Sequence, residues 1–199
     1  MDFIKRQSRI KKLKGKIYSR LLKGSVGGWG HKTTIYPPFW SNNLRQFFIG
    51  NNCQINPCGW IDCVTQYCGQ EYSPRLEIGD NAYIGHRVHI IVCGNMKIGR
   101  DVIMADGVYI SDNLHGYDKI DIPVEKHPLT HPGPVTIGDQ VWLGENVCVL
   151  PNVTIGRHSV IGANSVVTKD IPDYCVAVGS PARVIKRYNH EKQQWEKVI

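Results

Sequence analysis

Aliphatic residues recur at every sixth position through the middle of this 199-residue chain. The unbroken part of the series consists of Ile137, Leu143, Val149, Ile155, Ile161 and Val167. The same spacing occurs earlier in Ile78, Ile84 and Ile90, in Ile98, Met104 and Ile110, and in a weaker copy formed by Ile49, Ile55 and Ile61. Neither the 3.6-residue period of a helix nor the two-residue alternation of a strand produces a period of six. The spacing therefore indicates a repeating unit of one short strand and one turn.

A unit of six residues cannot bury its aliphatic side chain alone, whereas stacked units can bury a continuous core. Three units form a triangular coil of roughly 18 residues with the aliphatic side chains pointing inward. Four positions after each member of the unbroken series stands a small or β-branched residue that we expect near a corner: Val141, Val147, Val153, Ser159, Ser165 and Ile171. The chain has 22 Ile and 19 Val against 9 Leu, and this β-branched excess excludes a helical bundle.

The period is interrupted twice. Residues 116–134 contain four prolines and no repeat, and they predict an extruded loop, which in a compact repeat is usually functional. A smaller break covers residues 66–75. The repeat domain is expected to span residues 48–185, after an N-terminal arm and linker at 1–47. Residues 186–199 are expected to form a C-terminal helix that caps the exposed end of the coil stack.

The net positive charge of the chain comes from residues 1–32, which carry ten Lys and Arg against one acid, Asp2. The other 167 residues carry 14 basic and 16 acidic groups, so the body of the protein is near neutral and indicates no nucleic-acid partner. The apolar residues of the arm that follow helical spacing are Phe3, Ile10, Leu13, Ile17 and Leu21. Two interpretations stay open, a basic amphipathic helix on an anionic membrane surface or a surface helix packed on the domain.

The expected location is the cytoplasm, with peripheral contact at the inner face of the membrane through residues 1–32 as the alternative. No stretch reaches the roughly 18 apolar residues that cross a bilayer, and basic residues interrupt the apolar runs near the start. The seven cysteines are an odd number, and in a reducing compartment disulfides are not expected.

With its extruded loop, the repeat resembles that of the hexapeptide-repeat acyltransferases over about residues 48–185. The resemblance implies an all-β fold, a left-handed parallel β-helix. It also implies acetyl-CoA as the acyl donor, a sugar or glycan as the acceptor, and a homotrimer whose active sites lie between neighbouring subunits.

His115 stands where the six-residue period stops and the long loop begins. An imidazole with a pKa of roughly 6.5 suits a general base at neutral pH. The string from Ser111 to Tyr117 resembles the Asp-His-x-His-Gly string of polysaccharide O-acetyltransferases, with Asn113 in place of the first histidine. The resemblance implies that His115 deprotonates the acceptor hydroxyl. The group that orients its ring stays open between Asp112, Asp118, Glu145 and a backbone carbonyl.

The C-terminal part of the repeat is similar to the part of these enzymes that holds acetyl-CoA in a groove between subunits. The contact residues that the resemblance implies are Trp142, Gly144, Ala163, Thr168, Lys169, Arg183 and Lys186. Backbone groups at strand edges can pair with pantetheine amides, and Lys and Arg suit the phosphates. The tail from Lys186 to Glu196 resembles that of the lipopolysaccharide and colanic-acid O-acetyltransferases, which points to the surface-polysaccharide branch.

The eight histidines raise the question of a metal, and none is expected. Some proteins with this repeat are γ-class carbonic anhydrases, which have a His-x4-His pair and a third histidine upstream. The close pairs here are His86/His89 and His127/His131, and neither has that spacing. Four cysteines recur every five residues, at Cys53, Cys58, Cys63 and Cys68, which is not the Cys-x-x-Cys spacing of a zinc site.

The sequence therefore predicts an O-acetyltransferase that moves an acetyl group from acetyl-CoA to a sugar hydroxyl of a surface polysaccharide or its precursor. Tyr109 and Tyr117 lie near the loop and are candidates for stacking on sugar faces. Two alternatives stay open: an N-acyltransferase that acts on an amino-sugar with the same fold, and an inactive β-helix scaffold.

Overall fold

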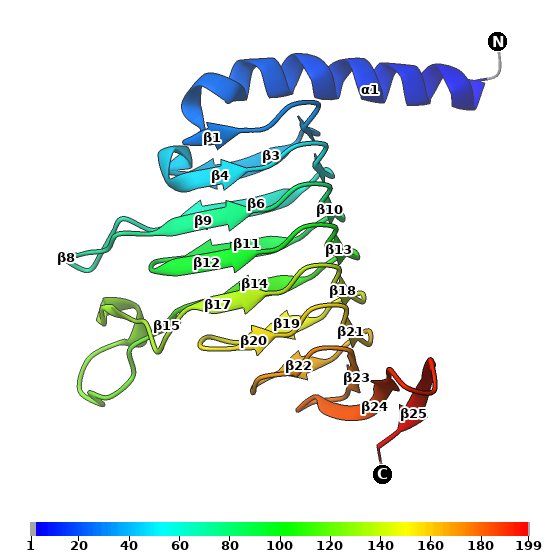
Figure 1. Ribbon diagram of the computed structural model, residues 1–199. Coiled ribbons are helices and arrows are strands. Elements are labelled where there is room, and N and C mark those ends of the chain that lie inside the picture. The colour runs from blue at the N-terminus through cyan, green and yellow to red at the C-terminus, as the bar shows by residue number, and fades with distance from the viewer. Residues whose placement is uncertain (1–2, 199) are drawn as a thin grey trace.

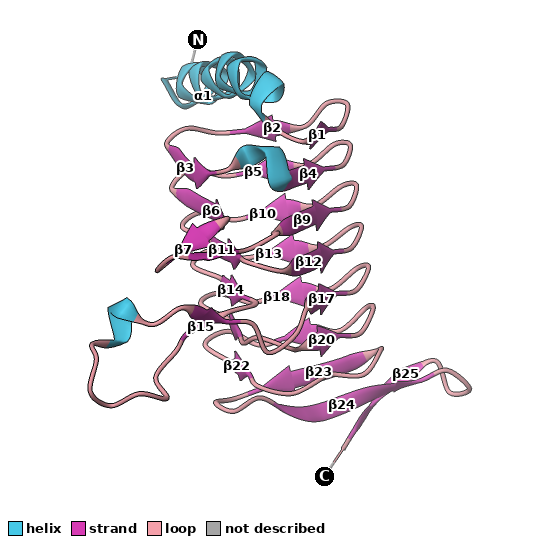
Figure 2. Cartoon of the chain, turned by 90° about the vertical axis from the view of Figure 1, so that its left-hand side faces the viewer, coloured by secondary structure: helices cyan, strands magenta, loops and turns pink. Residues whose placement is uncertain are grey.

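Three strands form each turn of a column, and strands of successive turns pair in parallel to give three sheets, here called A, B and C (Figures 1 and 2). The computed structural model describes residues 3–198. Sheet A consists of β1 (Gly28–Trp29), β4 (Phe47–Ile49), β9 (Arg75–Ile78), β12 (Asn95–Ile98), β17 (Val135–Ile137) and β20 (Thr154–Ile155). Sheet C consists of β3 (Phe39–Asn42), β6 (Gly59–Cys63), β11 (His89–Val92), β14 (Tyr109–Ser111), β19 (Cys148–Val149) and β22 (Val166–Val167).

Sheet B has the same parallel order through most of its length and then ends in an antiparallel hairpin. Its strands are β2 (Thr34–Ile35), β5 (Gln54–Ile55), β10 (Tyr83–Ile84), β13 (Ile103–Met104), β18 (Trp142–Leu143), β21 (Val160–Ile161), β23 (Cys175–Val178), β24 (Arg183–Asn189) and β25 (Gln194–Lys197). Outside the column are α1 (Phe3–Leu22), the hairpin β7 (Gln66–Tyr67) and β8 (Gln70–Glu71), and the pair β15 (Leu114–His115) and β16 (Leu129–Thr130). Short 3-10 turns occupy Lys23–Ser25, Leu44–Gln46 and Val124–Lys126.

The six-residue period predicts the core of this column correctly. All fifteen aliphatic residues of the series are buried, none more than 4% exposed. The residues four positions further on, from Val141 to Ile171, are buried as well. The neighbours on the same strands alternate outward, as Ile103 beside Met104 illustrates, with exposures of 49% and 0%. The parallel β-helix expected from the repeat is therefore confirmed.

The column begins earlier than the repeat in the sequence indicates. Strand β1 pairs with β4, and β2 pairs with β5, so a first coil is already formed by residues 28–42. In this part of the column the coils are longer, because Thr34 pairs with Gln54, 20 residues on, whereas Trp142 pairs with Val160, 18 residues on. The extra residues shift the aliphatic series by two positions, and this obscures the period near the N-terminus.

Both interruptions leave the column at the same corner, between a strand of sheet C and the next strand of sheet A (Figure 2). The loop after β14 packs against the β7–β8 hairpin. The Tyr67 hydroxyl donates a hydrogen bond to the Glu125 carbonyl at 2.8 Å. The Tyr72 hydroxyl accepts from the Leu129 backbone N–H at 2.7 Å and lies 3.1 Å from the Leu129 carbonyl oxygen. The shorter insertion therefore supports the longer one.

The predicted C-terminal helix at 186–199 is wrong. Strand β24 pairs antiparallel with β23, and β25 pairs antiparallel with β24. Strand β23 would otherwise end sheet B with an unpaired edge, and an added strand satisfies its backbone groups where a helix would not. Tyr188 and Trp195 face each other across the hairpin with ring centroids 5.4 Å apart. Residues 1–2 and 199, and the side chain of Phe3, lie outside the described part of the chain.

The expected N-terminal helix is present as α1, which lies across the first coil (Figure 1). Ser19 and Tyr18 fasten it there. The Ile35 N–H donates to Ser19 Oγ at 2.9 Å, and the Tyr18 hydroxyl donates to the Phe39 carbonyl at 3.2 Å. Within residues 3–198, no helix is long and apolar enough to span a membrane.

The alternation along β20 gives a direct test of the core. Ile155 is fully buried, and Thr154 beside it points outward. We expect Ile155→Ala to lower the free energy of unfolding by about 2–5 kcal/mol, because it leaves a cavity in the continuous core. The control Thr154→Ala is expected to change it by less than about 0.5 kcal/mol. Denaturant unfolding measures both values, and equal losses would contradict the inward assignment.

Candidate active site

A groove of about 540 Å³ runs along sheet C beside the extruded loop. Strands β3 and β6 form its floor, and the hairpin and the β15–β16 pair form its wall. The side chains that matter for its chemistry are Asn42, Trp60, Asp62, Tyr67, Asn113 and His115. A second hollow of about 490 Å³ adjoins it over Trp40 and His89, and the two share Asn42 and Trp60. Together they make one long groove with aromatic and hydrogen-bonding side chains.

The structure places His115 at the wall of this groove. It lies on β15, opposite Leu129 of β16, and its side chain is exposed. The ring of Tyr67 meets the imidazole edge-on, with ring centroids 5.3 Å apart. Among residues 3–198, no group forms a hydrogen bond with the His115 imidazole. The ring is therefore held by packing and by the β15–β16 pairing, and both ring nitrogens can serve a substrate.

Two of the candidate orienting partners are occupied elsewhere. Asp112 is fully buried, and its carboxylate accepts the backbone N–H groups of Cys93 and Gly94, both at 2.9 Å. It also accepts the side-chain amide of Asn113 at 2.9 Å. Asp112 therefore fixes the turn before His115 and does not orient its ring.

The other occupied candidate is Asp118, whose carboxylate lies 3.2 Å from Nδ1 of His127. The Nε2 of His127 lies 3.0 Å from the Lys119 carbonyl oxygen, and this histidine is 2% exposed. His127 belongs to the extruded loop at residues 116–134. Its buried position shows that it closes the loop on itself, and the sequence gives no signal for that role.

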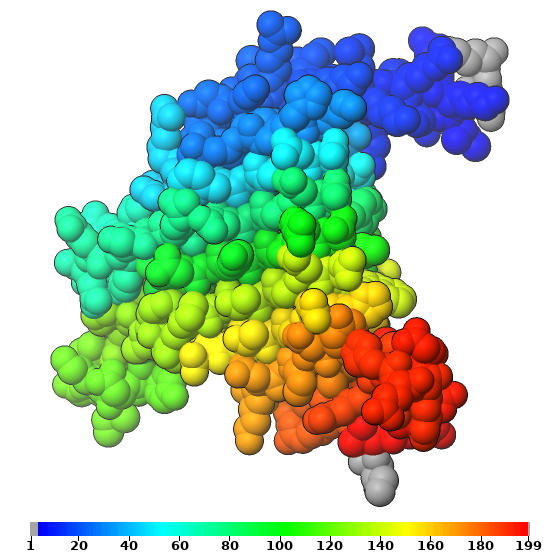
Figure 3. Space-filling model, viewed as in Figure 1, coloured from blue at the N-terminus to red at the C-terminus, as the bar shows by residue number. Residues whose placement is uncertain are grey.

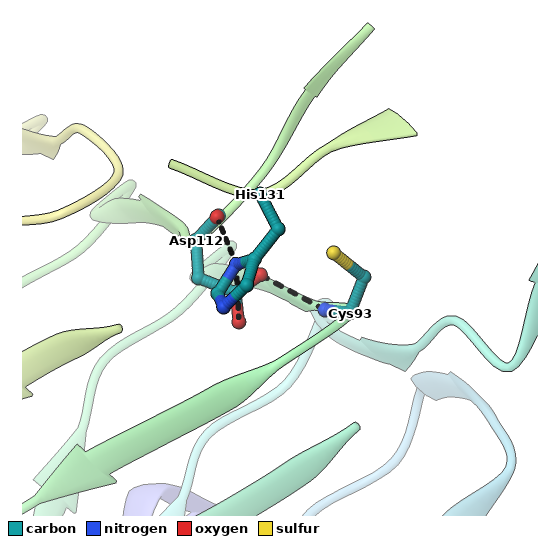
Figure 4. A group of neighbouring side chains, drawn as sticks. All are labelled: Cys93, Asp112 and His131. Atoms are coloured by element: carbon teal, nitrogen blue, oxygen red, sulfur yellow. Dashed lines mark hydrogen bonds and ion pairs between the residues drawn. The ribbon is translucent and has the colours of Figure 1, made fainter. Parts of the chain in front are cut away.

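His131 fixes the point where the loop returns to the column (Figure 4). Its Nδ1 donates to the Asp112 carbonyl oxygen at 2.8 Å and lies 3.8 Å from the Asp112 carboxylate. One ligand atom each from His131, Asp112 and Cys93 falls within 4.8 Å of the others. Burial, reinforced by the negative charge of Asp112, raises the pKa of the Cys93 thiol to about 12. With a protonated thiol and a carboxylate that already accepts three N–H groups, the cluster acts as an anchor for the loop.

The residues expected to hold acetyl-CoA lie on sheet B and at the C-terminal end of the column. Trp142 projects from β18 and is 52% exposed. Gly144 ends that strand, where a Cβ atom would stand 2.7 Å from the backbone nitrogen of Ala163 in the next coil. The close approach requires glycine, and it brings the backbones of Gly144 and Ala163 together.

The expected phosphate-binding groups lie further along the column. Arg183 and Lys186 are on β24, two strands beyond β21 in sheet B. Arg183 donates to the neighbouring Ala182 carbonyl at 2.9 Å. Thr168 and Lys169 are exposed residues that follow β22 in sheet C. None of the seven expected contact residues lines the His115 groove of the same chain.

Sheets B and C carry more apolar side chains on their outer faces than sheet A, where Phe48 of β4 points outward among charged and polar residues. The outward residues in register on sheet B include Tyr83, Ile103 and Trp142. On sheet C they include Trp40, Trp60, His89 and Tyr109. On sheet A they include Glu77, Lys97 and Thr136. These faces were not predicted from the sequence, although most of these residues stand directly before an inward aliphatic residue and could have been found that way.

Comparison with known proteins agrees with this architecture. Residues 134–169 match the family model described as bacterial transferase hexapeptide (six repeats). A protein of Escherichia coli K12 named as a lipopolysaccharide biosynthesis O-acetyl transferase, WbbJ, is 44% identical over 124 residues. That match covers 59% of this chain and 63% of WbbJ, less than two thirds of its length.

Two further proteins match over larger parts of their length. The galactoside O-acetyltransferase of E. coli K12 is 38% identical over 154 residues, which cover 76% of this chain and 70% of that enzyme. The solved structure of a hexapeptide-repeat acetyltransferase from Vibrio cholerae in complex with acetyl-CoA superposes with a TM-score of 0.56 at 25% identity. It covers 85% of this chain and 75% of that one. From the repeat, the fold and these relatives together, the chain belongs to the hexapeptide-repeat acetyltransferase family.

Proposed function

We propose that this protein transfers the acetyl group of acetyl-CoA to a sugar hydroxyl of a surface polysaccharide or its precursor, with His115 as the general base. The observation that carries the proposal is the place of His115, at the wall of a long groove with free ring nitrogens. The relatives named for O-acetyl transfer to lipopolysaccharide and to a galactoside support the sugar acceptor. The left-handed winding of the column is also part of this proposal, and it rests on the resemblance to the family.

The proposed reaction is a direct transfer. The acceptor hydroxyl gives its proton to an imidazole nitrogen of His115 as its oxygen attacks the thioester carbonyl carbon. The carbon–sulfur bond then breaks, and the leaving sulfur takes the proton back from the imidazolium. Cys63 and Cys93 are buried close to groove residues in the sequence, and burial raises the pKa of each thiol to about 12. Cys68, next to Tyr67, is exposed, and its Sγ donates to the Glu125 carbonyl oxygen at 3.2 Å. Buried, protonated thiols do not support an acyl-enzyme intermediate.

The acceptor is proposed to lie along the groove of sheet C. Trp60 is 40% exposed and meets His89 edge-on at 5.4 Å, which leaves part of its ring face open for stacking on a sugar. Asn42 donates to the Asp62 carboxylate at 3.2 Å on the adjacent outward row. Aromatic faces beside amide and carboxylate groups suit a polyhydroxyl ligand, and the joined hollows give room for more than one sugar unit.

The active site is proposed to form between neighbouring subunits of a homotrimer. Packing the apolar face of sheet B in one copy onto sheet C of the next is a heterologous contact, which closes into a ring. Three copies of a three-sided column would then bury sheets B and C and leave sheet A, the least apolar of the three faces, exposed. The same packing brings Trp142, Gly144 and Ala163 of one subunit towards the His115 groove of its neighbour. Acetyl-CoA would extend along the column, with its phosphates near Thr168, Lys169, Arg183 and Lys186.

Replacement of the base is expected to stop the reaction without removing the donor site. His115→Ala should lower kcat/KM for a sugar acceptor by about 10²–10⁴-fold, the usual contribution of general base catalysis. Release of the CoA thiol measures turnover, and calorimetry with CoA should give a Kd within about threefold of the native value. His31→Ala serves as the control, because His31 is an exposed histidine in the turn before β2. Turnover close to the native rate in His115→Ala would remove the assigned base.

The cations at the C-terminal end of the column give a complementary test. Arg183→Ala and Lys186→Ala should each raise the Kd for CoA about tenfold, because each loses a charged hydrogen bond to phosphate. The maximal rate at saturating acetyl-CoA should remain close to native. Lys197→Ala is a suitable control, since Lys197 pairs with Lys186 in the hairpin but is not assigned to the donor. An unchanged Kd in both test variants would refute this placement of the phosphates.

A further inference from the structure

Helix α1 packs on the column through its small residues. Gly15 and Ser19 are buried, and a Cβ atom at Gly15 would stand 2.5 Å from the ring of Tyr36. The Ser19 hydroxyl is bound to the backbone of Ile35 in β2. The docking face of α1 is therefore narrow, and besides these small residues it uses Tyr18 and Leu22, which pack against the core near the end of the helix.

The aliphatic side chains of α1 point away from the column instead. Leu13, Ile17 and Leu21 are 60%, 55% and 75% exposed. With about 100° of rotation per residue, these three lie on the side of the helix opposite Gly15 and Ser19. Figure 3 shows the N-terminal half of the helix projecting beyond the body of the protein. The structure thus leaves uncovered an apolar stripe, defined here as Leu13, Ile17 and Leu21.

Positive charge surrounds this stripe. Residues 3–32 contain ten basic side chains and no acidic one. Arg6, Lys14, Lys16 and Arg20 are exposed along the helix beside the stripe. A basic helix with an apolar stripe free on one side has the chemistry of a segment that lies in the interface of a membrane with anionic lipids.

We propose that α1 docks the column, N-terminal end first, onto an anionic membrane surface. The stripe would enter the boundary between headgroups and acyl chains, and the flanking Lys and Arg side chains would meet lipid phosphates. Charge favours lipid over a second copy of the helix, since two copies would bring like charges together. Helix α1 packs on the domain, as the second interpretation of the basic arm expects, but this packing does not use the stripe and leaves it free to meet a membrane.

This orientation would also set the direction in which an acceptor arrives, a consequence that rests on the proposed function. Trp40 lies on β3, in the coil beside α1, and the groove continues over Trp60 to His115. His115 follows β14, three strands further along sheet C, or roughly 15 Å at the usual strand spacing. The groove therefore leads from the membrane end of the column to the base, as a glycan acceptor attached to the membrane would require.

Vesicle sedimentation of the full-length protein tests the docking. Native protein should bind vesicles of phosphatidylcholine mixed with phosphatidylglycerol, should not bind phosphatidylcholine alone, and should dissociate as salt is raised. The variant Leu13→Asn/Ile17→Asn should bind at least about tenfold more weakly. The matched control Ile120→Asn/Val124→Asn changes two aliphatic residues of the extruded loop, 100% and 53% exposed, and should bind like native protein.

Each of the following binding results would overturn the proposal. They are a native protein that does not bind the anionic vesicles, a Leu13→Asn/Ile17→Asn variant that binds them undiminished, and native binding that is equal on neutral vesicles. A change in oligomeric state confined to the stripe variant would also overturn it, because the stripe would then cover another copy of the chain. Acetyl transfer to a soluble sugar should be unchanged in the stripe variant. Loss of membrane binding can therefore be distinguished from an error in the proposed acetyltransferase function.

Discussion

The column depends on burying one inward side chain per strand in a core that no single coil can enclose. Met104 and Ile155 are sealed only because a coil lies above and below each of them. This constraint fixes the inward positions and the parallel register, and it leaves two kinds of position free. Outward residues can vary within a strand, and corners can admit insertions without disturbing the stack.

The candidate site is built from both kinds of position, outward residues of the strands and insertions at a corner. The hairpin and the loop leave the column at one corner, where Tyr67 and Tyr72 join them. That corner borders sheet C, whose outward tryptophans form the floor of the groove, and it is there that β15 presents His115. Sheet B carries a different outward set, with Trp142 and the glycine turn at Gly144. In the proposed function, these two sets are the acceptor and donor halves of the transfer site, which one chain holds on different sides of the same core.

The six-residue period predicts which side chains are buried in the column, but the sequence predicts few of the contacts made at its surface. The inward residues, the loop at 116–134 and the N-terminal helix follow from spacing and composition. The first coil was hidden because its 20-residue length breaks the period. The C-terminal hairpin was hidden because no residue of β24 is buried, so the hairpin lies outside the aliphatic series that marks the column. The anchoring of the loop by His127 and His131 depends on contacts between distant residues, which a single sequence does not encode in any local pattern.

The central claim is that His115 of one chain acts on the donor held by another. Mixed assembly tests it most directly: His115→Ala protein is refolded together with Arg183→Ala/Lys186→Ala protein, and transfer is assayed at low acetyl-CoA. A site shared between neighbours predicts recovery to about a quarter of native activity, because random mixing of trimers pairs the two intact halves at that frequency. Mixed assemblies with no more activity than the separate variants would contradict the shared site.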